Sequence, residues 1–404
     1  MRLIYLSSST IPSRSANSIQ VMRMCQAFAK GGHQVTLIAQ RGKGMERGVD
    51  DVFSFYDVEN CFELMDLPAP PIKGKHCMYG YGAAKKAKSL QAQLVYGRSL
   101  IGCSMAGLMG LPVVYESHAP ANCGSLLSSW MFQRLVSAPG FRKLVVITHS
   151  LKTHYLDCFA SLADRLQVVP NGADPMPLNA KPADLPNQGC RLRVGYVGHL
   201  YAGKGIEVVE QLAPRCRWAD FHVVGGTDED IQACRARIPS IDNLFLHGFK
   251  SPAEADRYRF AADVLLAPYQ QRVAVFGGGG DSGPDIGQWM SPLKVFEYMA
   301  AGKAIISSDL PVLREVLTHN VNALLVPSTD IRAWERALLS LRDDLDLRTR
   351  LGNTARDEFL LRYTWAQRAA RVLEGLPSVF SESKGSSATE TSRFLKPVPG
   401  RVWP

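Results

Sequence analysis

Short apolar runs alternate with amphipathic stretches twice along the chain, and a proline-rich segment separates the two series. This segment, residues 174–190, holds four prolines and no hydrophobic period, which is typical of a linker. Alternating strands and helices indicate parallel strands joined by right-handed crossovers. The sequence therefore predicts an α/β fold with two doubly wound parallel-sheet domains, over residues 1–174 and 191–360, and a linker over 175–190.

The first series begins with a strand over residues 3–6, which a long polar loop connects to a helix. Asn17 or Ser18 is predicted to cap this helix, and Gly31 and Gly32 to end it. Residues 41–82 show no clear pattern apart from a proline cluster. The other elements of this series are predicted as strands over 34–39, 94–96, 113–116, 144–147 and 166–169, and as helices over 83–91, 99–109 and 125–137.

The second series repeats the alternation after the linker. Its strands are predicted over 193–197, 221–224, 244–246, 264–267, 304–307 and 323–326. Its helices are predicted to start at residue 206 and to run over 231–238, 253–262, 310–317, 331–341 and 346–361. A last helix within 361–376 is a candidate to cross back to the first domain. The Ser/Thr-rich residues 377–404 are predicted to be disordered.

Composition limits the classes of protein that fit this pattern. A chain of 404 residues with 46% hydrophobic and 21% charged residues suits two globular domains with full cores. No apolar run reaches membrane-spanning length, and the first ten residues read as a strand instead of a signal peptide, so we expect a cytoplasmic protein. Nine dispersed cysteines without a C-x-x-C pair indicate reduced thiols and argue against a structural zinc site.

The chain is basic, with a formal net charge of +9. It lacks a nucleic-acid-binding motif and a basic helix interleaved with aromatic residues, so we expect no nucleic-acid partner. Attraction to an anionic substrate, or peripheral contact with an anionic membrane, fits this charge better. For any single basic cluster, ordinary solubility remains the simpler explanation.

The stretch from Trp289 to Asp309 predicts a helix followed by a buried strand. Ser291 is a suitable N-cap, Pro292 a suitable first helical residue and Gly302 a suitable end. Apolar side chains recur at helical spacing between these limits, and residues 304–307 form a short apolar run. The pattern is typical of an α/β unit whose helix N-terminus lies at the carboxyl edge of the sheet.

The start of this helix has groups that suit a phosphorylated sugar. Free N–H groups at the Ser291–Leu293 end would hold a phosphate, and Lys294 adds a positive charge there. Glu297, near one turn further on, is placed to accept hydrogen bonds from sugar hydroxyls. A capped helix with a solvated Lys and Glu is the simpler alternative, and this motif alone does not decide between them.

A second candidate anion site follows the first strand of the second domain. The segment Gly198–Gly205, with the sequence GHLYAGKG, connects that strand to a helix, and Gly198 allows a ligand to approach the backbone closely. Lys204 and the helix start would contact a diphosphate from the side opposite Ser291. A solvated surface loop explains this segment alone, but two anion sites in one domain favour a diphosphate ligand.

Two further patterns are weaker than they look. Asp228-Glu229-Asp230 spells D-x-D, yet it begins a predicted helix, where acidic residues favour the helix dipole, so we read it as capping and expect no metal. Gly278–Gly283 matches G-x-G-x-x-G but does not join a first strand to its helix, so an NAD site is not expected. No cofactor is therefore predicted.

Taken together, these motifs resemble those of the retaining glycosyltransferases of family 4. That family carries a Gly-Arg…Lys-Gly loop and a Glu-x7-Glu helix motif, to which Gly198–Gly205 and the helix starting at Ser291 are similar. The turn at 170–174 looks like its N-G-V-D turn, and Asn322–Val326 looks like its N-G-L-L-V strand. In the first half, Ser13–Ser18 matches the acceptor loop in position, and Ala27–Thr36 looks like its L-A-x-x-G-H-E-V segment. The likeness covers roughly residues 1–375.

The resemblance implies the GT-B fold, in which two Rossmann-like domains face a central cleft, and transfer of a sugar from a nucleoside diphosphate sugar to an acceptor hydroxyl with retention of configuration. It implies His118 and Lys204 as catalytic residues, with His118 beside the transferring sugar and Glu116 either orienting it or pairing elsewhere. The implied donor-binding residues are Gly198, His199, Lys204, Gly205, Ser291, Pro292, Leu293, Lys294 and Glu297. The implied acceptor-side loop is Ser15, Ala16, Asn17 and Ser18. A glycan, a glycolipid or a small molecule is the expected acceptor.

Two positions depart from the family pattern. His199 stands where the family has Arg, and it cannot form a bidentate grip on a phosphate. Trp289 stands where the family has the first Glu of its helix motif, which touches the donor sugar there. Asp281 or Asp285, in the preceding loop, is a candidate replacement. The identity of the sugar therefore stays open.

Two other classes of protein remain compatible with these residues. A non-hydrolysing sugar-nucleotide 2-epimerase shares the fold but needs further acid/base carboxylates in the cleft. A nucleotide-sugar-binding protein without catalysis would explain Trp289 and His199. An assay with a nucleotide sugar and no acceptor separates the first class from a transferase, and turnover above donor hydrolysis removes the second.

Overall fold

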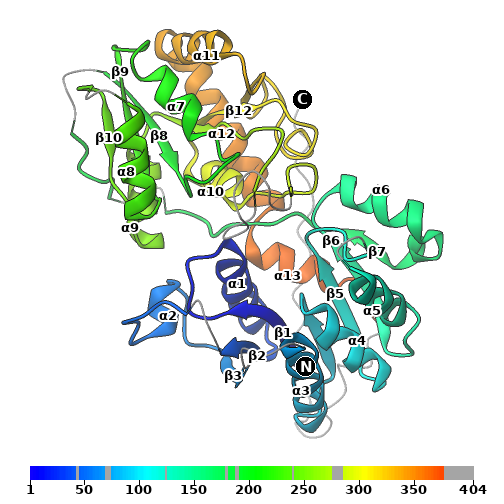
Figure 1. Cartoon of the computed structure of the whole chain (residues 1–404). Helices are drawn as coiled ribbons and strands as arrows, with labels where there is room; N and C mark the ends of the chain where they lie inside the picture. The colour runs from blue at the N-terminus through cyan, green and yellow to red at the C-terminus, as the bar shows by residue number, and fades with distance from the viewer. Residues whose placement is uncertain are drawn as a thin grey trace, which may run out of the picture.

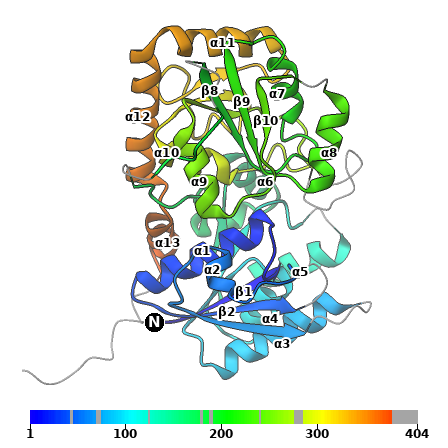
Figure 2. The same ribbon diagram turned by 90° about the vertical axis from the view of Figure 1, so that its left-hand side faces the viewer.

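The computed structural model describes residues 1–41, 45–68, 74–122, 125–177, 181–186, 191–238, 241–274 and 285–376. Within them the chain forms two bodies, one built by the first half of the sequence and the other by residues after the linker (Figure 1). The last helices run down one side and return to the first body (Figure 2). The predicted disordered tail and the glycine pattern at 278–283 lie outside the described residues.

The first body contains a seven-stranded sheet in the order β3-β2-β1-β4-β5-β6-β7, and all its strand pairs are parallel. Its strands are β1 (Arg2–Thr10), β2 (Gln34–Arg41), β3 (Glu63–Pro68), β4 (Leu94–Gly97), β5 (Val113–Ser117), β6 (Phe141–Val146) and β7 (Leu166–Val168). The helices between them are α1 (Ala16–Lys30), α2 (Val52–Phe55), α3 (Lys75–Ser89), α4 (Leu100–Leu108), α5 (Leu126–Val136), α6 (His149–Cys158) and the 3-10 helix η1 (Ala160–Arg165).

The second body contains a six-stranded parallel sheet in the order β10-β9-β8-β11-β12-β13. Its strands are β8 (Leu192–Val197), β9 (Ala219–Val224), β10 (Leu244–Leu246), β11 (Val264–Ala267), β12 (Ala304–Ser308) and β13 (Leu324–Val326). Its helices are α7 (Ile206–Leu212), α8 (Asp228–Arg237), α9 (Pro252–Ala261), α10 (Leu293–Ala301), α11 (Ile331–Asp343) and α12 (Leu345–Arg362). The prediction of two doubly wound parallel sheets is confirmed.

Both faces of each sheet are covered, which explains why the strands read as continuous apolar runs. In β1, Leu3 and Tyr5 belong to the core on one face of the sheet, and Ile4 and Leu6 to the core on the other. The period of two along a strand produces this division. The central strands are thus fixed by burial on two sides, and their carboxyl ends stay free to carry loops.

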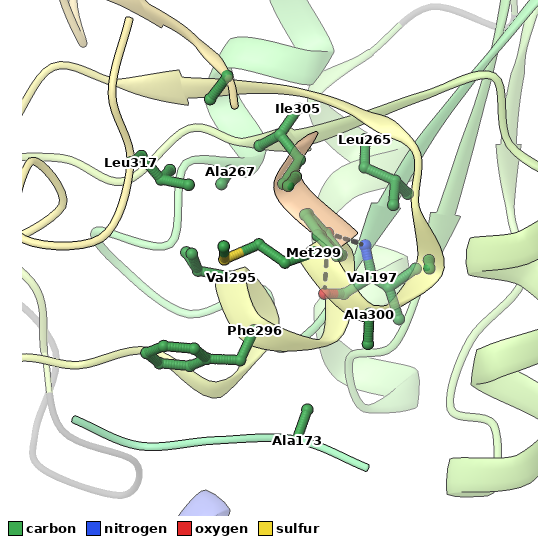
Figure 3. Packing of buried hydrophobic residues seen from close by; sticks show 14 of the residues in the cluster. Ala173, Val197, Leu265, Ala267, Val295, Phe296, Met299, Ala300, Ile305 and Leu317 are labelled. Atoms are coloured by element: carbon green, nitrogen blue, oxygen red, sulfur yellow. Dashed lines mark hydrogen bonds between the residues drawn. The ribbon is translucent and has the colours of Figure 1, made fainter. Parts of the chain in front are cut away.

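Helix α10 is the helix predicted from the stretch at 289–309, and it packs as an amphipathic helix should. Figure 3 shows Val295, Phe296, Met299 and Ala300 pointing into a cluster with side chains of β11 and β12. Complete burial of Phe296 is worth roughly 1.5–3 kcal/mol relative to an exposed side chain. Gly302 ends the helix with a φ of 66°, as predicted, because glycine enters this left-handed conformation without a Cβ clash.

Two predictions for the first body were wrong, and several of its elements were not predicted. The first residues of the polar loop proposed after residue 6 instead belong to β1, which runs to Thr10, and the loop itself covers residues 11–15. The cap of α1 is Ser15, whose side chain accepts a hydrogen bond from Ser18 N, and not Asn17 or Ser18. Strand β3 was missed because an edge strand with partly exposed side chains shows little alternation. Helix α6 was missed because only Leu151 and Tyr155 of its ten residues are buried.

In the second body, the helix predicted over 310–317 is wrong. The chain makes a series of turns between Pro311 and Val316. Its apolar residues, Leu310, Val312, Leu313 and Leu317, are buried at spacings that fit a helix and turns equally well. The spacing of the apolar residues therefore did not decide between a helix and a series of turns.

The two bodies are joined at two adjacent crossings. The backbone at Ala173 hydrogen-bonds the carbonyl of Tyr363 at 3.1 Å, and Trp365 N donates to the carbonyl of Ala173 at 3.2 Å. Beyond this point α13 (Trp365–Leu373) packs into the core of the first body beside α1, as both views show (Figures 1 and 2). A Cβ on Gly172 would lie 2.5 Å from the carbonyl oxygen of Tyr363, so the close crossing requires glycine.

Further contacts between the two bodies lie around these crossings. Asn171 N donates to Ser291 Oγ at 3.0 Å, and Asn171 Nδ2 donates to the Ser291 carbonyl at 2.7 Å. The carboxylate of Glu315 accepts hydrogen bonds from the backbone N–H groups of His149 and Ser150, at 2.8 and 3.2 Å. A second-body carboxylate therefore sits at the N-terminus of α6, where the helix dipole favours it.

Candidate functional site

The loop Gly198–Gly205 follows β8, the central strand from which the second sheet extends in both directions. Gly198 has a φ of 151°, and a Cβ there would lie 2.9 Å from Cε of Lys294. Gly205 has a φ of 85°, and a Cβ there would lie 1.8 Å from the carbonyl oxygen of Pro268. Both glycines are required for the loop to lie this close to its neighbours, which places it against α10.

Lys204 and Lys294 share one aromatic pocket. Lys294 Nζ lies 3.8 Å from the ring centroid of Tyr196 and 5.1 Å from that of Tyr269. Lys204 Nζ lies 5.2 Å from the Tyr269 centroid and 5.0 Å from that of Tyr201. The faces of these rings carry partial negative charge and stabilise an ammonium group, but they do not neutralise it.

The two lysines differ in exposure, because Lys294 is held away from water whereas Lys204 is only partly buried. Lys294 is buried, and its Nζ has no hydrogen-bond partner among the described residues. Burial, followed by the charge of Lys204, holds the pKa of Lys294 well below its usual range. Burial lowers the pKa of Lys204 to about 8. Two like charges in one pocket would raise the free energy of the empty site, and an anion placed between them would lower it.

His199 lies in the same pocket and is neutral. Burial and the charges of Lys204 and Lys294 lower its pKa to about 4. Its carbonyl accepts a hydrogen bond from the Tyr196 hydroxyl at 2.6 Å, which fixes the loop on the strand that precedes it. At this position the chain therefore supplies an imidazole without charge, so any positive charge of the pocket comes from the two lysines.

Glu297 lies one turn after Lys294 on α10, with 27% of its side chain exposed. Its carboxylate accepts a hydrogen bond from Arg259 Nη2 at 2.6 Å. Arg259 is buried and also pairs with Asp256 of its own helix. Arg259 was not singled out from the sequence, because an arginine within α9 looks solvated until its partner on α10 is known.

Ser291 does not cap α10, which corrects the prediction. The helix begins at Leu293 with Pro292 in the cap position, and no side chain among the described residues caps it. Ser291 Oγ instead accepts the hydrogen bond from Asn171 N at the domain junction. The first N–H groups of α10 therefore lack a side-chain partner, which is the property that an anion site at a helix N-terminus needs.

The acceptor-side loop of the first body meets the donor-side loop of the second. Ser15 and Ser18 hydrogen-bond each other and Ser13, so the start of α1 is a compact serine cluster. Ala16 opens α1, and the Oδ1 atom of Asn17 is buried without a hydrogen-bond partner among the described residues. The neighbouring Arg14 stacks at 4.0 Å over the ring of Phe249.

The backbone of Arg14 also hydrogen-bonds the ring of His199. The structure thus brings the predicted acceptor loop and the predicted diphosphate loop together across the two bodies. This contact joins the loop before α1 to the loop after β8, two segments that are far apart in the sequence.

His118 follows β5 and lies beside a buried carboxylate. Its Nε2 contacts Glu116 Oε1, and 17% of its side chain is exposed. Burial and the charge of Arg98 lower the pKa of His118 to about 4, against the opposing effect of Glu116. His118 is therefore neutral at pH 7. The described residues record no contact between His118 and either lysine, so these groups form two separate centres.

Trp289, which stands where the family has its first Glu, packs against the first body. Its ring lies 5.3 Å from the ring of His154 on α6. Asp285, one candidate replacement, has Oδ1 occupied by the backbone N–H groups of Val273 and Gly287, at 2.9 and 2.8 Å. Asp285 therefore shapes its own loop. Asp281, the other candidate, lies outside the described residues.

The D-x-D pattern begins α8, as its capping interpretation predicted. Thr227 Oγ1 accepts a hydrogen bond from Asp230 N, and Asp230 Oδ2 accepts one from Thr227 N, which together form a capping box. Among the described residues there is no group of three or more His, Cys, Asp or Glu side chains that could hold a metal ion.

None of the described helices has the length and apolar character needed to cross a membrane.

Two family models match the chain, one on each side of the linker. The model described as Glycosyltransferase Family 4 matches residues 18–176, and the model described as Glycosyl transferases group 1 matches residues 191–344. Together they span both sheets. The chain belongs to the group 1 glycosyltransferases of family 4.

Known proteins of this kind share part of the sequence. The amylovoran biosynthesis glycosyltransferase AmsK of Erwinia amylovora is 28% identical over 205 residues, which are 49% of this chain and 47% of AmsK. A phosphatidyl-myo-inositol mannosyltransferase of Mycolicibacterium smegmatis is 30% identical over 175 residues, which are 42% of this chain and 40% of that protein. The match thus spans about half the length of these relatives or less.

The fold has many solved counterparts. The crystal structure of HepE from Anabaena in complex with UDP superposes with a TM-score of 0.68 at 13% identity, over 93% of this chain and 99% of the HepE chain. At this level of identity the likeness concerns the fold, which is GT-B.

Proposed function

We propose that the protein transfers a sugar from a nucleoside diphosphate sugar to an acceptor hydroxyl, with retention of anomeric configuration. The observation that carries this proposal is that the buried Lys294 and the partly buried Lys204 share one aromatic pocket at the carboxyl end of β8. A diphosphate leaving group develops negative charge as the glycosidic bond breaks, and preorganised cations stabilise that charge most in the transition state. Lys204 would therefore act in catalysis by stabilising the departing diphosphate.

The donor would lie on the second body, with its diphosphate between Lys204, Lys294 and the first N–H groups of α10. Gly198 and Gly205 let the loop lie against Lys294 and Pro268, which shapes the backbone that the diphosphate would meet. Glu297, already oriented by Arg259, would accept hydrogen bonds from ribose hydroxyls. In support, HepE of the same fold was crystallised with UDP and with UDP-glucose.

The acceptor would bind on the first body, near Ser15–Ser18 and His118. Among the residues that the structure describes, no pair of carboxylates stands out as nucleophile and acid, so attack from the leaving-group side fits better than a double displacement. The protein's own cations take the place of a divalent metal in this proposal. The likeness to AmsK supports a role in polysaccharide or other glycoconjugate synthesis. The family match favours transfer over 2-epimerisation.

We further propose that the first body contacts an anionic membrane surface through α5. Leu126 is 93% exposed, and Leu127 and Trp130 are each about half exposed on the same helix. The guanidinium of Arg134 lies 5.2 Å from the ring of Trp130, which combines a cation with an interfacial aromatic side chain. Co-sedimentation with phosphatidylglycerol vesicles, lost in Leu126→Ser/Trp130→Ser and absent with phosphatidylcholine, tests this contact.

A two-stage assay tests the transfer. Thermal shift with UDP-, GDP- and ADP-sugars selects the donor, because a ligand of the native state raises the melting temperature. Transfer to candidate acceptors is then measured in EDTA and with added Mg²⁺. Stabilisation by one nucleotide class and EDTA-resistant transfer are expected. Conversion of the donor to its C2 epimer without an acceptor would contradict the proposal, and activity that EDTA abolishes and Mg²⁺ restores would overturn its metal-free part.

A further inference from the structure

Glu116 is the centre of a buried polar network that the sequence did not reveal. Its side chain is fully buried, and its two oxygens accept hydrogen bonds from groups on four different segments of the chain. Gln20 Nε2 of α1 donates to Oε1 at 2.9 Å, and the Tyr96 hydroxyl of β4 donates to Oε2. His118 Nε2 contacts Oε1. A buried carboxylate with this many donors is fixed in position.

The fourth segment is α13, which supplies the cation of this network. Arg368 Nη2 lies 2.9 Å from Glu116 Oε1, and Nη1 lies 3.3 Å from Oε2, so the contact is two-pronged. The Arg368 side chain is 1% exposed. Its remaining donors reach the carbonyls of Pro170 and Val169 at 2.8 and 3.4 Å, next to the domain junction. Arg368 therefore connects α13 and the domain junction to Glu116.

The charge state of Glu116 determines the proton on His118. Burial alone would raise the pKa of Glu116, but Arg368, His118 and Arg98 hold it well below its usual range. An ionised carboxylate only accepts hydrogen bonds, so the Nε2 atom of His118 must carry the proton of the neutral ring. Nδ1 is then unprotonated. Glu116 thus selects one tautomer of His118, and Arg368 keeps Glu116 in the form that does so.

We propose that Arg368 is a positioning residue for His118, acting through Glu116, and that the transfer site is complete only when α13 is docked on the first body. The inference rests on the proposed function, because it takes His118 to act beside the transferring sugar. It gives a physical reason for the return of the chain to its first body. The last helix brings the one cation that contacts Glu116 directly among the described residues.

The charged and titratable groups facing this centre come from every element packed on it. They are Tyr5 of β1, Tyr96 of β4, Arg98 after β4 and Arg368 of α13. Burial raises the pKa of both tyrosines well above their usual range, so they stay neutral. Arg98 reaches the centre through Gln20 Oε1, at 2.9 Å. Removing Arg368 therefore leaves Glu116 without a cation in direct contact.

The test compares Arg368→Met with a matched control on the same docking surface. Lys143 holds the end of α13 through the carbonyls of Val372 and Glu374, also donates to Gln167 Oε1, and does not touch Glu116, so Lys143→Met loosens the helix without touching the Glu116 network. We expect Arg368→Met to lower kcat about 10- to 100-fold, the scale seen when a residue that orients a metal-bound histidine is removed. The donor KM should change little in both variants, and Arg368→Lys should recover part of kcat.

The second readout does not depend on activity. In ¹⁵N-histidine NMR spectra, with the His118 signals assigned by their loss in His118→Gln, the wild type should show a neutral ring protonated at Nε2 between pH 6 and 8. Arg368→Met should change this tautomer signature, and Lys143→Met should not. If the wild type proves not to transfer sugars, the spectra still test the positioning of His118, so the two failures are distinguishable.

Unchanged kcat and unchanged His118 signals in Arg368→Met would overturn the proposal. Equal losses in Lys143→Met would also overturn it, because general docking of the helix would then be the cause. If Arg368→Met does not fold, Glu116→Gln/Arg368→Met removes the charge pair as a whole, which buried sites tolerate better. A folded double variant with wild-type kcat would refute the role of the pair.

Discussion

The two buried charge centres of this protein are built in opposite ways. In the first body, Glu116 is matched by Arg368 and by uncharged donors, so the centre is nearly balanced and fully hydrogen-bonded. In the second body, Lys204 and Lys294 face the same aromatic ring, and Lys294 Nζ has no hydrogen-bond partner among the described residues. A balanced centre fixes geometry, whereas an unbalanced one stores electrostatic free energy that a ligand of opposite charge releases.

The difference predicts what each centre does in catalysis. Substitutions at the balanced centre should change the rate of the chemical step, because they move a positioned side chain. Substitutions at the unbalanced centre should change the affinity for the anionic ligand and, with the opposite sign, the stability of the free protein. The following predictions test this division, in order of decreasing expected effect.

The largest effect is expected for His118→Ala. If His118 makes its best contact in the transition state, its loss lowers kcat by about two orders of magnitude or more. Donor affinity should hardly move, because the nucleotide lies on the second body. Kinetics, donor Kd and melting temperature measured on one preparation decide the case. A destabilised variant with wild-type kcat would show that His118 is structural.

Lys204→Ala comes next. Loss of one charge-assisted contact should weaken binding of the free nucleoside diphosphate by roughly 1.5–3 kcal/mol. Titration calorimetry measures this change directly. Arg217→Ala is a suitable control, since that arginine pairs with Asp242 on the surface and is more than half exposed. Equal affinity in Lys204→Ala and wild type would remove Lys204 from the donor site.

The sequence predicted the unbalanced centre better than the balanced one. Lys204 and Lys294 lie on segments whose local pattern, a strand followed by a loop or helix start, already indicates the carboxyl edge of a sheet. Arg368 gave no such signal, because its partner lies 252 residues away and an arginine within an amphipathic helix looks solvated. The same reason explains Ser291, whose hydroxyl is used by a residue 120 positions earlier. Local patterns predict elements and loops, whereas buried polar pairs depend on the tertiary fold.

The pH dependence of nucleoside diphosphate binding should follow the protonation of Lys204. Its pKa in the free protein is lowered to about 8 by burial, and a bound diphosphate would raise it. The protonated form binds the anion, so the contribution of Lys204 is constant below about pH 8 and falls by up to about tenfold per pH unit above it. The affinity difference between wild type and Lys204→Ala should therefore shrink between pH 8 and 10. A constant difference over this range would contradict the assignment.

The smallest predicted effect is a change in the stability of the free protein, and its sign differs between the two centres. Lys294→Met should stabilise the free protein by roughly 1 kcal/mol, because it removes a buried donor without a partner while keeping most of the packing. That gain corresponds to a rise of roughly 2–4 °C in the melting transition of the second body. The same variant should bind the nucleoside diphosphate more weakly, so stability and affinity move in opposite directions. Arg368→Met, by contrast, leaves Glu116 buried and unpaired, so it should lower stability while donor affinity stays near wild type. Melting curves recorded with and without the nucleotide measure both quantities. If Lys294→Met melts below the wild type, the lysine pocket is compensated within the protein, and the contrast between the two centres is wrong.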